Sequence, residues 1–307
     1  MSPAAIALVV TLLPVMFGSD LAGLLERGGQ ASYGAEQIVS CATPDGVTSA
    51  LLSIEQADGR MVVGSDLAGS KAVAMGPGRL ATVGDDGAVE QVAVVGRAAP
   101  DFVAYAITET GGTRFLGRDA TTYRLDRDGV MRAELVLDDL TGVVLRATTY
   151  SADGTLYCVQ RFISFEPGER TLVAPPAVER EALVPLDRAS GFFPEQILGF
   201  VRLDEYEDAD GLRFTYYSDG FFSFGVFQTP VVVPLPGGVS VHLARGDYQR
   251  VFAPGQVFYA WEVVDGGMAL IGDLPPDMHD AVLDSLPKPQ KPSFFKRIWR
   301  TLFGGQS

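Results

Sequence analysis

Histidine and cysteine are scarce in this sequence, and their scarcity excludes most recognisable catalytic and metal-binding arrangements. The chain contains two histidines, His242 and His279, and two cysteines. A Ser-His-Asp enzyme needs a histidine base beside its nucleophile, and neither histidine lies near a Gly-x-Ser-x-Gly turn. Neither lies at metal-ligand spacing from a cluster of cysteines or acids. We therefore predict no catalytic residue, no metal site and no cofactor, and we expect both histidines to be ordinary half-exposed side chains.

Basic residues are also few. Lys and Arg number 24 against 38 Asp and Glu, which gives a net charge of -14 at pH 7. A body of this charge repels the phosphate backbone, so we expect no nucleic-acid partner. The charge is unevenly spread, because the last 21 residues, 287–307, carry five of the cations and no acid. Without those five, 19 bases face 38 acids, a charge of -19.

Only one long apolar run is present, over residues 4–17, and no charge precedes residue 20. Its length suits the core of a signal peptide better than a membrane-spanning helix, which needs about 20 residues. The usual basic residues before the core and a clear cleavage site are missing. Residues 1–18 are therefore read as a signal peptide or a retained N-terminal anchor, and a buried helix is the alternative. Either of the first two readings places the protein outside the cytoplasm, in the periplasm or at the cell envelope.

Asp-Gly dipeptides, by contrast, are abundant. Eight of them separate runs rich in Val, Ile, Leu, Thr and Tyr. Asp supplies a local hydrogen bond and Gly a positive φ, so the dipeptide favours the tight turn of a β-hairpin. The sequence therefore predicts a mainly β, α+β fold built from antiparallel strands. One helix is expected to begin at Ser19 or Asp20 and to end at Gly28-Gly29, before a first strand over residues 36–43.

The two cysteines, Cys41 and Cys158, each lie within a probable strand. They are too far apart in the sequence for a C-x-x-C redox or zinc motif. In an exported protein they could pair as a disulfide across the sheet. The alternative is that both are buried as small hydrophobic side chains.

Proline and glutamate mark a boundary between two domains. Residues 166–185 contain four of each and no sustained periodicity, which is typical of an extended linker. We place an N-terminal domain at residues 19–170, the linker at 171–185 and a C-terminal domain at 186–286.

The tail, residues 287–307, has a helical pattern of its own. Its apolar residues share one face of a helix, and its cations lie on the other face. Such a stripe suits an anionic membrane surface or a groove on a partner, and the alternative is a helix that docks on its own domain. The candidate contacts of the tail are Phe294, Phe295, Arg297, Ile298, Trp299, Leu302 and Phe303.

Two hairpin patterns carry a resemblance to a known family. In residues 135–165 a strand, an Asp…Thr-Gly turn, a strand ending in Tyr, an Asp-Gly turn and a strand ending in Phe-x-x-Phe follow one another. In residues 214–227 the turn Tyr217-Ser218-Asp219-Gly220 precedes a strand ending in Val-Phe. In this order, each in its own domain, the two patterns resemble the RseB/MucB family. The resemblance covers residues 20–286 discontinuously, and residues 59–100 contribute little to it.

The resemblance implies a fold and a function. The fold would be a curved antiparallel half-barrel sheet with a helical lid, like that of lipoprotein carriers, followed by a smaller mixed α+β domain. The function would be negative regulation of an alternative, envelope-stress sigma factor. The protein would bind the extracytoplasmic part of a membrane-spanning anti-sigma factor, and a lipid would act as the releasing signal. Such a protein is not an enzyme.

The resemblance also suggests contacts and an alternative function. The hairpin residues Tyr217, Asp219, Phe221 and Phe222 are candidate partner contacts if the aromatic rings are exposed, whereas the alternative is that they belong to the core. The same half-barrel could instead serve a lipid or lipoprotein carrier, which holds a lipid or acyl chain. A third hypothesis is an envelope scaffold tethered by its tail.

Overall fold

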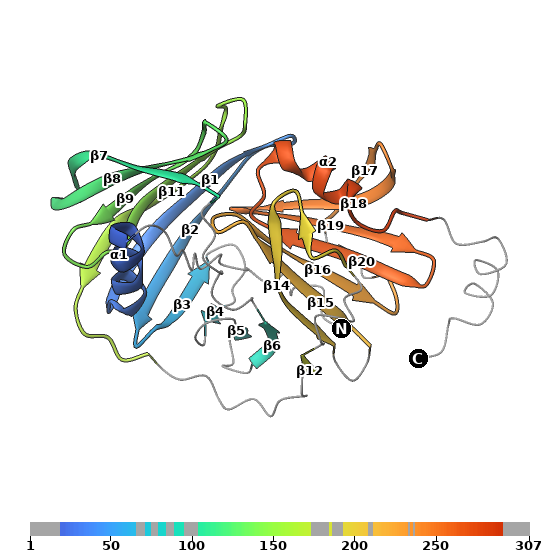
Figure 1. Cartoon of the computed structure of the whole chain (residues 1–307). Helices are drawn as coiled ribbons and strands as arrows, with labels where there is room; N and C mark the ends of the chain where they lie inside the picture. The colour runs from blue at the N-terminus through green and yellow to red at the C-terminus, as the bar shows by residue number, and fades with distance from the viewer. Residues whose placement is uncertain are drawn as a thin grey trace.

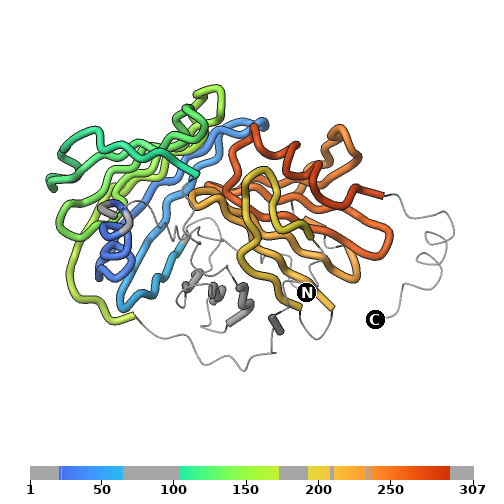
Figure 2. The backbone as a smooth tube through the Cα atoms, in the orientation of Figure 1, coloured from blue at the N-terminus to red at the C-terminus, as the bar shows by residue number. Residues whose placement is uncertain are grey.

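Two antiparallel β-sheets lie side by side in the computed structural model (Figure 1). Figure 2 traces the same arrangement as a tube, with the two sheets in separate halves of the molecule. The predicted mainly antiparallel β fold is confirmed. The apolar run 1–18 and the tail from residue 291 lie outside the described residues, which are 19–65, 71–74, 79–83, 89–94, 104–172, 184–185, 193–207, 211–232, 234–235 and 237–290.

The first sheet has eleven strands, in the order β6-β5-β4-β3-β2-β1-β11-β10-β9-β8-β7. Every neighbouring pair is consecutive in the chain except β1 and β11, which meet at the centre. The strands are β1 (Tyr33–Thr43), β2 (Gly46–Ala57), β3 (Arg60–Ser65), β4 (Lys71–Ala74), β5 (Arg79–Val83), β6 (Val89–Val94), β7 (Ala106–Phe115), β8 (Arg118–Arg127), β9 (Val130–Asp138), β10 (Val144–Tyr150) and β11 (Leu156–Pro167).

Local turn chemistry explains the hairpins of this sheet. Asp128 and Gly129 both have positive φ, at 53° and 77°, as the turn between β8 and β9 requires. Between β9 and β10, the Asp138 carboxylate accepts hydrogen bonds from the Thr141 amide at 2.9 Å and from its hydroxyl at 2.7 Å. The meander expected over residues 135–165 is therefore confirmed, as strands β9, β10 and β11.

Helix α1 (Ser19–Gln30) packs against the first sheet and ends one residue past the expected stop at Gly28-Gly29. The Gln56 side-chain amide of β2 donates to the carbonyl oxygens of Gly28 and Gly29, at 2.8 and 3.0 Å. These bonds satisfy carbonyls that the last helical turn would leave unpaired. A Cβ at Gly28 would overlap the carbonyl oxygen of Gly142. Gly28 therefore has a second role beside its place near the end of the helix, because the missing side chain permits close packing against the β9–β10 turn.

The second sheet has nine strands. Eight follow the order β12-β14-β15-β16-β20-β19-β18-β17, and β13 pairs with β14. Helix α2 (Pro276–Asp284) follows the last strand. The hairpin expected over residues 214–227 is confirmed as β15 and β16. The strands are β12 (Val184–Pro185), β13 (Gln196–Ile197), β14 (Phe200–Glu207), β15 (Arg213–Ser218), β16 (Ser223–Thr229), β17 (Val239–Leu243), β18 (Gly246–Ala253), β19 (Gln256–Val263) and β20 (Gly266–Gly272).

One hydrophobic cluster is shared by the two sheets. It contains Tyr105 and Leu125 from the first part of the chain and Phe222, Tyr259 and Trp261 from the second. A separate cluster lies within the first sheet, around the rings of β1 and β11. Because the shared cluster removes apolar surface of both domains from water, it favours a fixed arrangement of the two sheets.

Candidate functional site

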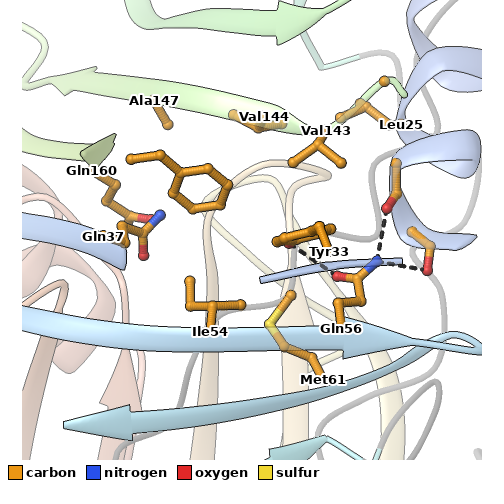
Figure 3. Close-up of a pocket in the computed structure, with 14 residues that line it drawn as sticks. Leu25, Tyr33, Gln37, Ile54, Gln56, Met61, Val143, Val144, Ala147 and Gln160 are labelled. Atoms are coloured by element: carbon orange, nitrogen blue, oxygen red, sulfur yellow. Dashed lines mark hydrogen bonds between the residues drawn. The ribbon is translucent and has the colours of Figure 1, made fainter. Parts of the chain in front are cut away.

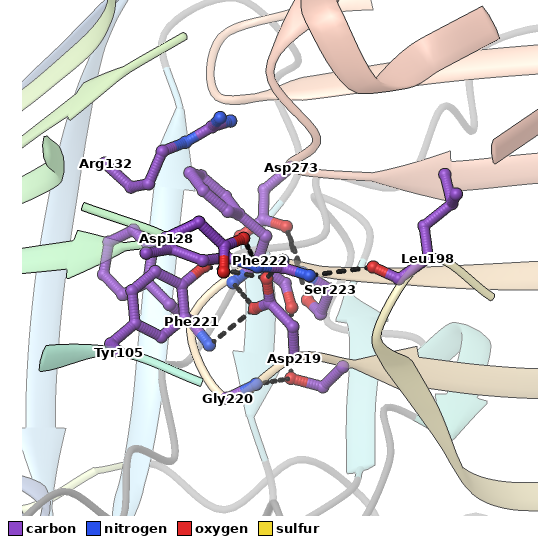
Figure 4. A network of polar contacts seen from close by, with 12 residues as sticks. Tyr105, Asp128, Arg132, Leu198, Asp219, Gly220, Phe221, Phe222, Ser223 and Asp273 are labelled. Carbon is purple, nitrogen blue, oxygen red and sulfur yellow. Dashed lines mark hydrogen bonds and ion pairs between the residues drawn. The ribbon is translucent and has the colours of Figure 1, made fainter. Parts of the chain in front are cut away.

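The turn between β15 and β16 lies at the junction of the two domains (Figure 4). Tyr217, Asp219, Phe221 and Phe222 have exposed fractions of 0%, 0%, 4% and 1%. The Phe221 ring meets the ring of Tyr105 edge-on, with the ring centres 5.9 Å apart. Of the two alternatives for Phe221 and Phe222, burial in the core is the one that the structure shows, because the first domain covers the turn.

Asp219 is the centre of a polar network at this junction. Its Oδ1 accepts the amides of Phe221 and Phe222, at 3.0 and 2.8 Å, within its own turn. Its Oδ2 accepts the Tyr105 hydroxyl at 2.7 Å and also pairs with Arg127, so both of these contacts cross the domain boundary. Burial raises the pKa of Asp219, while the hydrogen bonds and Arg127 lower it. Burial also raises the pKa of Tyr105, which keeps its hydroxyl a donor.

Two further ion pairs join the domains. Arg132 of β9 lies 3.1 Å from Asp277 in the first turn of α2. Arg250 of β18 donates to both carboxylate oxygens of Asp45, at 2.7 and 2.8 Å. The arginine side chains are mostly buried. The acids are more exposed, at 28% for Asp277 and 51% for Asp45, so it is removal of the acid that would leave a mostly buried arginine without its partner.

The disulfide of the first sheet is in contact with the second domain. Cys41 of β1 and Cys158 of β11 face each other in the strand register and are bonded. Both are buried. The amide of Gly255, in the turn between β18 and β19, donates to the Cys41 sulfur at 3.1 Å. The sulfur is thus part of the domain contact as well as of the sheet.

Two more titratable groups with shifted pKa values, Asp273 and His279, are also hydrogen-bonded within the protein. Asp273 accepts the Ser223 amide at 2.6 Å, and burial raises its pKa to about 7. His279 is buried between the Tyr259 hydroxyl, at 3.1 Å from Nδ1, and the Leu274 carbonyl, at 2.9 Å from Nε2. Burial lowers its pKa to about 4, so it is neutral at pH 7. The expectation of a half-exposed histidine is wrong for His279, because α2 packs onto β19.

His242 is exposed and lies 2.8 Å from the Asp247 carboxylate. Within the described residues, no group of three histidine, cysteine or acidic side chains could hold a metal ion. Neither described helix has the length and hydropathy to cross a bilayer.

An apolar pocket of about 160 Å³ lies between α1 and the first sheet (Figure 3). Its walls come from α1, β1, β2, β3, β10 and β11, and from the turn before β10. The side chains of Leu25, Tyr33, Ile54, Met61 and Phe162 supply apolar surface. Its side-chain amides are those of Gln37, Gln56 and Gln160, and none of the described residues that line it is charged.

No local sequence pattern marks this pocket or the three arginines of the domain junction. The pocket residues are scattered over more than 130 positions of the chain, and each arginine is a single residue outside any motif. A pattern analysis finds neither, because both depend on which strands become neighbours. The tail candidates Phe294, Phe295, Arg297, Ile298, Trp299, Leu302 and Phe303 lie outside the described residues.

Comparison of sequences finds no relative: no family model matches the chain, and no curated protein matches it. Comparison of structures does. A solved complex of MucA and MucB from Pseudomonas aeruginosa matches with a TM-score of 0.51 and 20% identity, over 89% of this chain and 100% of that chain. A second structure, of MucB with MucA(peri), matches with a TM-score of 0.49 and 17% identity, over 90% and 100%.

A LolA superfamily protein from Nitrosomonas europaea matches half of this chain and 96% of its own, with a TM-score of 0.26 and 12% identity. The first MucA/MucB match spans both sheets of the present structure. The chain therefore has the fold of the matched chain in the MucA/MucB complex.

Proposed function

We propose that this protein is an extracytoplasmic negative regulator of an alternative sigma factor. It would bind the extracytoplasmic part of a membrane-spanning anti-sigma factor. The observation that carries the proposal is the fold match across both domains with a chain of a MucA/MucB complex. The two hairpins that carried the sequence resemblance, β9–β11 and β15–β16, are both formed, each in its own sheet.

The chemistry of the buried groups agrees with binding rather than catalysis. Asp219, Asp273 and His279 have perturbed pKa values, which is a common mark of active sites. Each of them, however, is held by partners within the protein and maintains the domain contact or the packing of α2. Their perturbation is thus accounted for by structural burial.

The proposed mechanism is protection of the partner. A regulator bound to the extracytoplasmic segment of an anti-sigma factor would shield that segment from proteolysis, so the sigma factor would stay sequestered. Release by a lipid signal would end the protection. The disulfide supports an extracytoplasmic location, because such bonds persist in oxidising compartments.

The basic tail would hold the protein at an anionic membrane surface. Deletion of residues 288–307 should then reduce sedimentation with vesicles of anionic phospholipid, and neutral vesicles are the matched control. Undiminished sedimentation of the truncated protein would discard the membrane role of the tail.

The test of the regulatory function is direct binding. The full chain is titrated calorimetrically with the extracytoplasmic segments of the single-pass anti-sigma factors of the source organism. We expect one of them to bind and to become resistant to protease in the complex. If none binds, while lipid copurifies with the protein and passes to an acceptor, the regulator proposal is wrong and the carrier alternative is favoured. The apolar pocket beneath α1 is the observation that keeps this alternative open.

A further inference from the structure

We infer that the pocket beneath α1 binds a single uncharged aromatic side chain of an extended peptide, whose peptide groups pair with Gln37 and Gln160. The inference rests on the proposed function, because the peptide would belong to the protein partner. It specifies what the partner must present to this surface.

The size of the pocket sets the first limit. A cavity of about 150 Å³ lined by apolar side chains holds one benzene molecule, and this pocket has about 160 Å³. It therefore accommodates one ring but only a short part of a long acyl chain. The Tyr33 and Phe162 rings and the Met61 thioether form its walls. Rings and thioethers make favourable edge contacts with an aromatic guest.

The pocket wall is held in shape before any ligand arrives. Gln56 donates to the carbonyl oxygens of Gly28, Gly29 and Ala31, at 2.8, 3.0 and 3.1 Å. Its Oε1 accepts the Tyr33 hydroxyl at 3.1 Å. The bonds tie the end of α1 to β2 and fix the ring of Tyr33. A preformed site loses less conformational entropy on binding than a site that must be ordered.

Two amide side chains at one end of the pocket differ from Gln56 in their hydrogen bonding. Gln37 of β1 and Gln160 of β11 lie close together in Figure 3, and both are half-buried. Neither side chain is hydrogen-bonded to another of the described residues, whereas Gln56 uses its full amide. A side-chain amide offers both donors and an acceptor, as does a peptide group. The two amides can therefore form hydrogen bonds with the peptide groups that flank the inserted aromatic residue.

Charge favours a peptide over a lipid. Among the described residues that line the pocket there is no lysine or arginine, so these residues provide no partner for a phosphate or carboxylate headgroup. An acyl chain would also form no hydrogen bond with either amide, because its methylene groups are neither donors nor acceptors. An aromatic residue between two peptide groups uses the ring cavity and the amides together.

The experiment uses the full chain with methyl-labelled methionine, and the NMR signal of Met61 as the reporter. The probes are toluene, which has only the ring, N-acetyl-phenylalaninamide, which has the ring and two peptide-like groups, and N-acetyl-alaninamide, which lacks the ring. We expect both aromatic probes to shift the Met61 signal and the alanine probe to leave it unchanged. Absence of any shift with the aromatic probes overturns the inference.

Variants separate the cavity from the amides. Gln160→Ala should lower the affinity for N-acetyl-phenylalaninamide about threefold to tenfold, which corresponds to the loss of roughly one hydrogen bond. It should leave the affinity for toluene unchanged. Gln196→Ala, an exposed glutamine of the second domain, is the matched control and should change neither. Val144→Phe should fill the cavity and abolish the binding of both aromatic probes. Equal loss of both probes in Gln160→Ala would contradict the role of the amide.

Two competing occupants are tested in the same way. Binding of N-acetyl-leucinamide as tight as that of the phenylalanine probe would overturn the aromatic preference. Stoichiometric palmitate that displaces toluene would overturn the peptide in favour of a lipid. These probes contain no partner protein, so their failure is distinct from failure of an anti-sigma segment to bind.

Discussion

Arg127 of the first domain and Asp219 of the second form an ion pair whose carboxylate is fully buried. The contact does more than join two charges. Asp219 also shapes its own turn through two backbone amides, and Arg127 also donates to the Leu198 carbonyl at 2.8 Å. The fold of a hairpin and the docking of two domains thus depend on one side chain.

This relationship predicts strong coupling between the two residues. Asp219→Ala and Arg127→Ala should each lower the free energy of unfolding by about 3–5 kcal/mol, because each leaves a buried partner uncompensated. The double variant should lose less than the sum, by about 0.5–3 kcal/mol. Denaturant unfolding measures all three. Arg124→Ala is the control, since it breaks an exposed pair with Asp126 and should cost less than about 1 kcal/mol. Additive losses would show that the pair is not the unit of docking.

The raised pKa of Asp273 predicts that the stability of the fold depends on pH. Its pKa is about 7 in the folded chain, above the value of an exposed carboxyl. Between about pH 4 and 7 the folded state therefore holds a proton that the unfolded state releases, so this group makes the chain more stable as pH falls through 7. Its contribution changes by at most about 1.4 kcal/mol per pH unit. We expect Asp273→Asn to flatten the pH dependence of the unfolding free energy between pH 7 and 5, and to be more stable than the native chain at pH 8, where the native carboxylate is charged. An unchanged slope would contradict the assignment.

His279 should act in the opposite sense. Its pKa is lowered to about 4 in the folded chain, so between pH 6.5 and 4 the unfolded state binds a proton that the folded state does not. The stability from this group is present above pH 6.5 and is lost as pH falls toward 4. His279→Gln, which retains a donor and an acceptor, should remove that loss. His242→Gln is the control, because this histidine is exposed. Titration of the ring by NMR would show directly whether His279 stays neutral at pH 5.

Reduction of the disulfide should weaken the fold. Cys41 and Cys158 are 117 residues apart, and a cross-link that closes a loop of this order contributes about 2–5 kcal/mol. We expect the reduced chain and the Cys41→Ala/Cys158→Ala variant to lose similar amounts in denaturant unfolding. The Cys41→Ser/Cys158→Ser variant retains an oxygen that can accept the Gly255 amide, so it separates the cross-link from the domain contact. Unchanged stability on reduction would contradict the prediction.

Local chemistry made the hairpins predictable. Asp-Gly turns such as Asp128-Gly129 determine their own backbone geometry. The aromatic runs on both sides of Asp219-Gly220 predict the hairpin that the structure shows as β15 and β16. Burial of Phe221 and Phe222 was one of two alternatives, but the side chains that cover them could not be predicted, because Tyr105 and Arg132 lie about 90 to 115 positions away in the chain. The aromatic pattern of a hairpin is the same whether solvent or a second domain covers it.

Helix α1 and the pocket also depend on residues that are distant in the sequence. Gly28-Gly29 is an ordinary stop signal, and the helix ends at Gln30. The end of the helix is held by the side chain of Gln56 and by the close approach of Gly142, and neither contact can be predicted from the local sequence. The pocket depends on these contacts, since the last turn of α1 forms one of its walls.

A matched pair of glycines tests that dependence. Gly142 and Gly154 both have positive φ, at 74° and 82°. Alanine at either position should therefore cost about 1–2 kcal/mol through backbone strain. A Cβ at Gly142 would also overlap the carbonyl oxygen of Leu24 in α1, whereas one at Gly154 would meet nothing within 4 Å. We expect Gly142→Ala to lose more stability than Gly154→Ala, to displace α1, and to abolish the response of Met61 to toluene, while Gly154→Ala retains that response. Equal behaviour of the two variants in unfolding and in probe binding would mean that the contact between α1 and the β9–β10 turn does not define the pocket.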